Sequence, residues 1–157
     1  MKIKLLMIGK TTDISLSKLI DEYVGRLKYY VPLEQIIIPE LKNIKNMRVD
    51  QQKEKEAELI LNKLGGSDEL ILLDEKGKQL TSKGFSEFLS KKISTSSRDL
   101  LFVIGGPYGY SPKVYEKAKF LLSLSSMTFS HQMIRLLFTE QLYRAFTILK
   151  GEPYHHE

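Results

Sequence analysis

The chain of 157 residues is 42% hydrophobic and 27% charged, which is the composition of an ordinary globular protein and fits a single domain. It contains no cysteine, so disulfides, thiolate catalysis and cysteine-bound zinc are excluded. The formal net charge of +5 is compatible with a polyanionic partner such as RNA, although many small lysine-rich proteins are basic without one.

The sequence predicts neither a secretion signal nor a membrane-spanning segment. Residues 1–9 have only a short apolar run, and no small-residue cleavage site follows it. No apolar stretch approaches the roughly 18 residues that are needed to cross a bilayer. We therefore expect a cytoplasmic protein with one domain over residues 1–157.

Strand-like and helix-like patterns alternate in the first half of the chain. Short apolar runs indicate strands, and apolar residues that recur every three or four positions indicate helices. Asp13 can cap the first helix, Pro39 stops the second strand, and Gly65 ends the second helix. In chain order we predict a strand over 2–8, a helix over 13–27, a strand over 35–38, a polar, mobile loop over 40–50 and a helix over 54–64.

The same alternation continues to the C-terminus. Ser82 and Ser111 can each cap a helix, and Pro112 suits the first turn of the second of these. Gly151 stops the last helix. We predict a strand over 69–73, a turn over 74–77, a helix from 82, a strand over 99–104, a helix from 111, a β-like serine-rich segment over 122–129 and a long helix over 133–150.

This order of elements predicts an α/β fold with a mainly parallel sheet flanked by helices. Strands such as 70–73 and 100–104 are apolar throughout, as expected when both faces of a strand are buried. The helix over 133–150 is apolar around most of its circumference, which predicts burial on more than one side. A partner subunit is the favoured second cover, and a central position within the monomer is the alternative.

Two segments of the second half are candidates for ligand binding. Residues 104–109, Ile-Gly-Gly-Pro-Tyr-Gly, place glycines at the end of a buried strand, where the backbone can approach a ligand closely. Their spacing fits neither a dinucleotide fingerprint nor a phosphate loop, and an ordinary glycine turn is the alternative. The small hydroxyl residues of 124–130 could hold a loop against a flat apolar ligand or could form an edge strand.

Side chains suited to proton transfer and RNA contact gather near the C-terminus. All three histidines, His131, His155 and His156, lie there, and histidine exchanges protons near neutral pH. No suitably spaced carboxylate pair accompanies His131, so we expect no metal site. Arg144 is placed either for an ion pair along its helix or for a phosphate contact, and Tyr154 could stack on a base.

Together these motifs resemble one family, the bacterial SPOUT-class pseudouridine methyltransferases of large-subunit ribosomal RNA. In order, the motifs are Gly-Gly-Pro-x-Gly, Leu-Ser-x-Met-Thr-Phe, His-Gln-Met-x-Arg, Glu-Gln-x-Tyr-Arg-Ala-Phe and Gly-Glu-Pro-Tyr-His. The opening Ile8-Gly9-Lys10 extends the resemblance over the whole chain. The sequence departs from the pattern at Ser130, where we expect proline in many relatives.

The resemblance implies a SPOUT fold, in which the C-terminal part of the chain threads through a loop to make a trefoil knot. Ordinary folds avoid knots, so the pattern of elements alone does not predict one. The resemblance also implies a homodimer that uses S-adenosylmethionine to methylate N3 of a pseudouridine in 23S ribosomal RNA on the assembled ribosome. The implied cofactor-binding residues are Leu73, Gly105, Leu124, Ser125, Ser126, Met127, Thr128 and Phe129.

The residues that the resemblance places at the RNA are His131, Arg144, Tyr154 and His155. We expect His131 or His155 to assist deprotonation of the base, Arg144 to stabilise the developing anion or hold a phosphate, and Tyr154 to position the base. A noncatalytic ribosome-binding protein on the same fold and a flavodoxin-like nucleotide binder are the alternative functions. Lys42, Lys45 and Arg48 of the polar loop are either rRNA contacts or solvent-facing residues.

Overall fold

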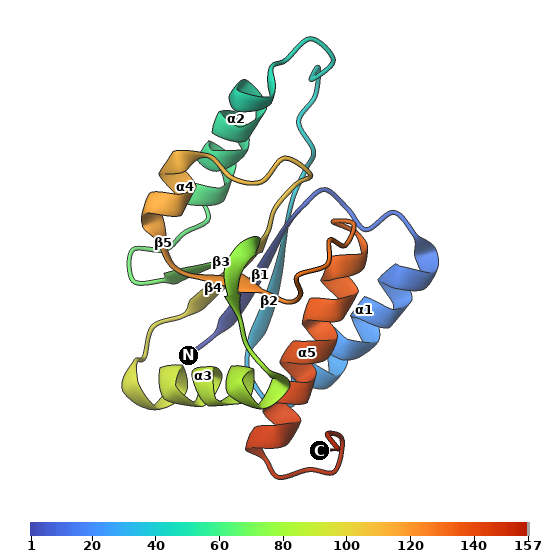
Figure 1. Ribbon diagram of the computed structural model, residues 1–157, viewed down its shortest axis with the longest axis vertical. Coiled ribbons are helices and arrows are strands. Elements are labelled where there is room, and N and C mark those ends of the chain that lie inside the picture. Colours follow the sequence, from blue (N-terminus) through green and yellow to red (C-terminus); the bar gives the residue numbers. More distant parts are fainter. Residues whose placement is uncertain (157) are drawn as a thin grey trace.

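The computed structural model describes residues 1–156, which form a parallel sheet with helices on both faces (Figure 1). The elements follow one another as β1 (Ile3–Ile8), α1 (Ile14–Leu27), β2 (Leu33–Ile38), α2 (Val49–Leu61), β3 (Glu69–Gln79), α3 (Ser82–Thr95), β4 (Leu100–Ile104), α4 (Pro112–Lys117), β5 (Ala118–Ser123) and α5 (Met133–Leu149). No helix among these residues is long and apolar enough to cross a membrane.

The sheet has the strand order β2-β1-β4-β3-β5, and every neighbouring pair is parallel. Ile104 at the end of β4 pairs with Met7 of β1 on one side and with Leu73 of β3 on the other. The carboxyl ends of β1 and β4 and of the part of β3 that pairs with β4 therefore meet at one edge of the sheet. The predicted α/β fold with a mainly parallel sheet is confirmed.

Two hydrophobic cores cover the two faces of the sheet. All five residues of β4 are buried, and successive side chains point to opposite faces because a strand repeats every two residues. Phe102 packs against Phe138 of α5, with ring centroids 5.0 Å apart, in a core that also includes side chains of α1 and α3. Val103 lies in the other core with Val114 of α4 and Ile60 of α2. Helices α1, α3 and α5 thus cover one face, and α2 and α4 cover the other (Figure 1).

Local capping explains where several helices begin. The Asp13 carboxylate accepts the Leu16 amide at 2.9 Å, as predicted for the start of α1. At α3 the capping side chain is Thr81, whose hydroxyl accepts the Gly84 amide at 2.9 Å, and not the expected Ser82.

Helix α2 begins and ends earlier than the sequence pattern predicts. It runs over Val49–Leu61, where we expected a helix over 54–64 and a loop reaching residue 50. After the exposed Val49 the first turn carries only polar side chains, so it lacks the apolar period that marks a helix in sequence. At its start, the Arg48 amide donates to the Gln51 side chain at 3.3 Å.

Strand β3 does not end in the predicted turn over 74–77 but continues to Gln79. Its pairing with β5 shifts register between Leu73 and Lys78. Within this irregularity the Lys76 amide donates to the Asp74 carboxylate at 2.8 Å, the side-chain-to-backbone bond that aspartate also makes in turns. The turn-forming residues therefore produce a bulge inside a longer strand.

The extension of β3 crosses β5 at very close range. A Cβ atom on Gly77 would lie 2.6 Å from the backbone carbon and oxygen of Leu121, so only glycine fits there. In Figure 1 the green end of β3 passes across the orange segment that leads from β5 towards α5. This crossing is compatible with the trefoil knot, which stays a prediction.

Candidate functional site

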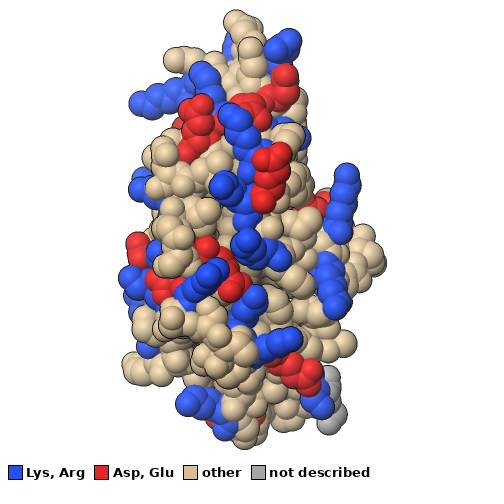
Figure 2. All heavy atoms as spheres, turned by 90° about the vertical axis from the view of Figure 1, so that its left-hand side faces the viewer, with Lys and Arg blue, Asp and Glu red and all other residues tan. Residues whose placement is uncertain are grey.

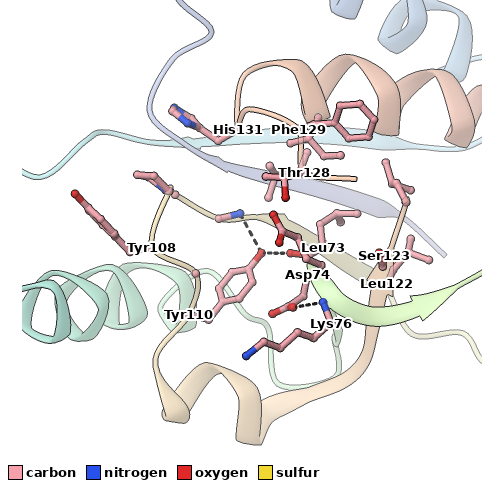
Figure 3. Close-up of a pocket in the computed structure, with 18 of the residues that line it drawn as sticks. Leu73, Asp74, Lys76, Tyr108, Tyr110, Leu122, Ser123, Thr128, Phe129 and His131 are labelled. Carbon is pink, nitrogen blue, oxygen red and sulfur yellow. Dashed lines mark hydrogen bonds between the residues drawn. The ribbon is translucent and has the colours of Figure 1, made fainter. Parts of the chain in front are cut away.

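A cleft of about 610 Å³ lies at the edge of the sheet where β3 and β4 end (Figure 3). Leu73, Ile104 and Leu122 form an apolar floor, and each is the last or nearly the last residue of a regularly paired strand segment. Ligands of open parallel sheets bind outside the carboxyl ends of strands, which is the position of this cleft.

The glycine loop over 105–109 forms one wall of the cleft. A Cβ atom on Gly105 would lie 2.8 Å from the ring of Tyr110, and one on Gly106 would lie 3.2 Å from the Glu56 carboxylate. Burial of Glu56 beneath this loop raises the pKa of its carboxyl group. Gly109 has φ +79°, a conformation that side chains rarely adopt. The glycines therefore let the backbone itself form the wall.

The opposite wall is the loop that follows β5. The Ser123 hydroxyl donates to the Ser125 carbonyl at 2.9 Å, and the Ser125 hydroxyl accepts the Met127 amide at 2.9 Å. Such local bonds compete with strand pairing, so the predicted β-like segment over 122–129 is wrong: β5 is Ala118–Ser123 and a loop follows. The serine-rich segment was interpreted either as a loop against a ligand or as an edge strand. In the structure it is a loop that lines a cavity.

Ser130, the departure from the family pattern, takes part in the start of α5. Its hydroxyl accepts the Met133 amide at 3.1 Å, and its carbonyl accepts the Ile134 amide at 3.0 Å. A proline at this position would keep the carbonyl but lose the hydroxyl. The serine therefore caps the helix next to the cleft.

The cleft collects most of the residues that the resemblance implied for the cofactor. Ser126 is exposed and does not line the cleft, whereas the other seven do. His131 also lines it, at the end of the loop before α5 (Figure 3). The lining residues that were predicted are Leu73, Gly105, Leu124, Ser125, Met127, Thr128, Phe129 and His131.

A hydrogen-bonded pair at the cleft was not predicted from the sequence. The Tyr115 hydroxyl donates to one oxygen of Asp74, whose other oxygen accepts the Lys76 amide. Burial and the Asp74 carboxylate raise the pKa of Tyr115 to about 12, so its hydroxyl stays a donor at neutral pH. The position of Asp74 directly after an apolar strand was the available signal, and it was interpreted only as part of a turn.

Arg135 supports the cleft from within the protein and was also missed. It has no exposed surface, and its guanidinium donates to the carbonyls of Ile8 at 2.6 Å, Gly9 at 2.9 Å and His131 at 3.2 Å. Gln132 adds a bond from its side chain to the Lys10 carbonyl at 3.2 Å. The loop after β1 and the segment around His131 are thereby joined. Arg135 was visible as the last residue of the motif His-Gln-Met-x-Arg.

The other three candidates for RNA contact form a separate cluster, in which Tyr154 and His155 of the C-terminal tail contact Arg144 of α5. Arg144 pairs with Glu140 at 2.7 Å, and its guanidinium carbon lies 4.7 Å from the centre of the Tyr154 ring. The Tyr154 hydroxyl donates to Glu140 at 3.1 Å, and burial is the main cause that raises its pKa. Since α5 rises about 16 Å between Met133 and Arg144, one subunit does not bring this cluster to His131.

Arg144 determines the hydrogen-bonding role of one ring nitrogen of His155. Nδ1 of His155 lies 3.1 Å from a terminal nitrogen of Arg144. A guanidinium can only donate, so Nδ1 accepts and carries no proton in this arrangement. In this geometry the Nδ1 lone pair is occupied by Arg144 and is unavailable for proton abstraction from a substrate.

The C-terminal tail, residues 151–156, folds back onto the protein and does not extend away from it (Figure 1). Gly151 has φ +68°, and the Glu152 amide donates to the Thr147 carbonyl at 2.9 Å, which is the Schellman ending of a helix. The Tyr30 hydroxyl donates to the Glu152 carboxylate at 2.6 Å and holds the turn in place. Glu157, the last residue of the predicted single domain, lies outside the described residues.

On the face drawn in Figure 2, charged side chains do not concentrate at one point. Figure 2 shows Lys and Arg spread from top to bottom over one face, with Asp and Glu among them. Lys113 of α4 pairs with Glu54 of α2 at 3.1 Å. This distribution is consistent with a diffuse basic surface and not with a narrow anion-binding site.

Comparisons with known proteins agree with the geometry. Residues 1–155 match the family described as predicted SPOUT methyltransferases. The ribosomal RNA large subunit methyltransferase H of Flavobacterium johnsoniae is 59% identical over 157 residues, which are 100% of both chains. The protein of the same name from Bacteroides thetaiotaomicron is 52% identical over the same length, again 100% of both chains.

A solved structure supports the fold alone. A probable methylase family protein from Haemophilus influenzae superposes with a TM-score of 0.54 and 13% identity, covering 99% of this chain and 70% of that one. The match over residues 1–155 is to the SPOUT family. This chain belongs to the SPOUT methyltransferase family.

Proposed function

We propose that the protein transfers a methyl group from S-adenosylmethionine to N3 of a pseudouridine in 23S ribosomal RNA, on the assembled ribosome in the cytoplasm. Relatives that are 52% to 59% identical over the whole chain carry the name of a large-subunit ribosomal RNA methyltransferase. The observation that carries the proposal is the cleft at the ends of β3 and β4, which collects seven of the eight expected cofactor-binding residues. We further propose that residues 1–157 act as one domain.

The cleft has the size and chemistry that the cofactor needs. Its volume of about 610 Å³ lies within the range of small-molecule sites, about 300–1,000 Å³. The apolar floor of Leu73, Ile104 and Leu122 suits the flat face of an adenine ring. The backbone of the glycine loop and the hydroxyls of Ser125 and Thr128 offer polar groups at its edge. Leu73, Gly105, Leu124, Ser125 and residues 127–129 are therefore our proposed cofactor-binding positions.

The bound cofactor supplies an activated methyl group on a sulfonium centre. The protein must then align the base for in-line displacement and help N3 to lose its proton. His131 lines the cleft and is our proposed base. Arg144 offers a positive charge for the developing anion, and Tyr154 offers an aromatic face for the base. The Arg144 contact at Nδ1 argues for a supporting role of His155 in orienting Arg144.

A homodimer would unite the two separated groups of residues. Several large apolar side chains beside the cleft and along α5 remain exposed on the single subunit, among them Met127, Phe129, Met133 and Leu149. Burial of such residues favours association of a second copy. We propose that the Arg144 cluster of one subunit faces the His131 side of the partner's cleft. Exposed Lys42, Lys45 and Arg48 before α2 would add contacts to rRNA phosphates.

Methyl transfer to ribosomes tests the proposed function. Assembled ribosomes and free 23S rRNA from a strain that lacks the protein would be incubated with the purified protein and S-adenosylmethionine, and the nucleosides would be analysed by mass spectrometry. We expect N3-methylpseudouridine in RNA from ribosomes and much less in free RNA. Ribosome binding without methyl transfer would support the noncatalytic alternative, and methylation at another atom would reject the proposed target.

A further inference from the structure

Tyr110 places a hydroxyl group where two neighbouring strands of the sheet end. Its side chain comes from the glycine loop, is 4% exposed and reaches back beneath the cleft. The hydroxyl oxygen lies 2.9 Å from the carbonyl of Leu73, 2.9 Å from the carbonyl of Val103 and 3.0 Å from the amide nitrogen of Gly105 (Figure 3). One side chain therefore contacts three backbone groups, one each from β3, β4 and the glycine loop.

The number of protons on a hydroxyl limits what it can do here. It accepts one hydrogen bond from the Gly105 amide and donates its single proton to either Leu73 or Val103 at any moment. Leu73 and Gly105 are also the two strand-end positions of the proposed cofactor site. The Gly105 amide is occupied by Tyr110, so the loop amides that follow Gly105 are the ones left to meet a ligand.

The glycine at position 105 leaves room for the ring of Tyr110. The Cβ atom of any other residue at Gly105 would lie 2.8 Å from a ring carbon of Tyr110. The Tyr110 and Tyr115 rings pack edge to face, with centroids 5.7 Å apart, and Tyr115 in turn donates to Asp74. Tyr110 thus connects the glycine loop to β3 through both its hydroxyl and its ring.

We propose that Tyr110 is a positioning residue for cofactor binding, whose hydroxyl fixes the Leu73 carbonyl and the Gly105 amide so that the glycine loop presents its backbone to the cofactor. The proposal rests on the proposed function, since it takes the cleft as the cofactor site. Burial raises the pKa of Tyr110 well above its usual range, so the hydroxyl stays protonated and serves as a bridge, not as an acid or base.

Calorimetric titration of the free protein tests this role. In Tyr110→Phe the dissociation constants of S-adenosylmethionine and S-adenosylhomocysteine are expected to rise at least tenfold. Ser86→Ala is the control, because it removes another buried hydroxyl, bonded to the Lys83 carbonyl within α3 and away from the cleft. This control should bind both ligands within twofold of wild type even if its melting temperature falls equally.

Kinetics separate positioning from general destabilisation. At a temperature well below melting, Tyr110→Phe should raise KM for the cofactor while kcat at saturating cofactor stays within about threefold. A folded Tyr110→Phe variant that binds both ligands within twofold of wild type would overturn the proposal. Absence of binding by the wild-type protein would instead defeat the proposed function, so the two failures are distinguishable.

If Tyr110→Phe does not fold, a measurement on the wild-type protein still tests the proposal. Amide hydrogen exchange followed by NMR should show a slow Gly105 amide in the cofactor-free protein, because the buried hydroxyl accepts its hydrogen bond. The Gly105 rate should change little when the cofactor is added. Fast exchange in the free protein would show that the hydroxyl does not hold this amide and would reject the proposal.

Discussion

The guanidinium of Arg135 is buried among backbone carbonyls and has no carboxylate partner within hydrogen-bonding distance in residues 1–156. Burial lowers the pKa of Arg135, as expected for a charged group removed from water. Bonds to Ile8, Gly9 and His131 offset that cost, because arginine offers five donors in a fixed geometry. The charge is retained in the core because it joins two loops that neither helix packing nor sheet pairing would hold.

Replacing Arg135 with methionine should therefore destabilise the protein. The change leaves the carbonyls of Ile8, Gly9 and His131 without their donor, and we expect a loss of roughly 2–4 kcal/mol in the free energy of unfolding. Urea denaturation measures this loss. Arg98→Met is the control, because Arg98 is exposed, and it should change stability by less than about 0.5 kcal/mol. Equal stability of the two variants would contradict the buried network.

Glu56 gives the protein a distinctive pH dependence. Burial raises the pKa of its carboxyl group in the folded state, so the folded protein holds this proton at a pH where the unfolded chain has lost it. Folding stability contributed by this group therefore falls as the pH rises from the ordinary glutamate pKa through the raised value.

In Glu56→Gln this fall should be absent. Denaturation curves measured at steps from pH 4 to pH 8 should show that the variant gains stability relative to wild type as the pH rises. Glu58→Gln, on the same helix but exposed, should track wild type. A difference between Glu56→Gln and wild type that does not depend on pH would show that the carboxyl pKa is not raised.

At the scale of elements, the sequence predicts strands and helices best where an apolar period is strong. Residues 99–104 and 133–150 were placed within a residue or two, because the buried faces of β4 and α5 impose their periods directly. The start of α2 was missed because its first turn is polar. The shift of β5 to Ala118–Ser123 was missed because Ser123 and Ser125 form local bonds that no hydrophobic pattern reveals.

The crossing of β3 and β5 predicts an unusual intolerance at Gly77. Adding one methyl group in Gly77→Ala brings a carbon within 2.6 Å of the Leu121 backbone, which cannot move aside as a flexible side chain would. We expect a loss of roughly 3 kcal/mol or more in the free energy of unfolding. Gly66→Ala, whose Cβ has no atom within 4 Å, should be neutral or slightly stabilising. Similar stabilities in chemical denaturation would argue against the close crossing.

At the scale of the whole molecule, the candidate site was only partly predictable. The sequence motifs identified most of the segments that line the cleft, because glycines and small hydroxyl residues follow strand ends in a regular way. The separation of two motifs along the sequence does not show whether they meet in the folded protein. His131 and Arg144 are close in sequence, yet a rigid helix holds them apart within one subunit. The proposed knot and the proposed dimer likewise depend on long-range topology and on a second chain.

Mixed dimers test whether one active site needs both subunits. His131→Ala and Arg144→Ala should each be inactive alone, but refolding them together in equal amounts should restore roughly one quarter of wild-type methyl transfer. Half of randomly formed dimers contain one chain of each kind, and one of their two sites has both side chains intact.

A second mixture distinguishes the two arrangements independently. The double variant His131→Ala/Arg144→Ala, refolded with an equal amount of wild type, should leave roughly one quarter of the activity if sites are shared between subunits. If each site lies within one chain, this mixture keeps roughly half, and the first mixture recovers nothing. That pair of results would reject the shared site.

The bonds of Arg135 and Gln132 join residues 8–12 to residues 131–135, across 120 or more positions of sequence. Contacts of such high sequence separation form late, because a long loop must close before they contribute any stability. In a nascent chain, the edge of the cleft beside β1 is therefore complete only after α5 has been synthesised. A fragment that ends before α5 would lack these bonds and the α5 side chains of the core, so we expect it to have no complete cleft.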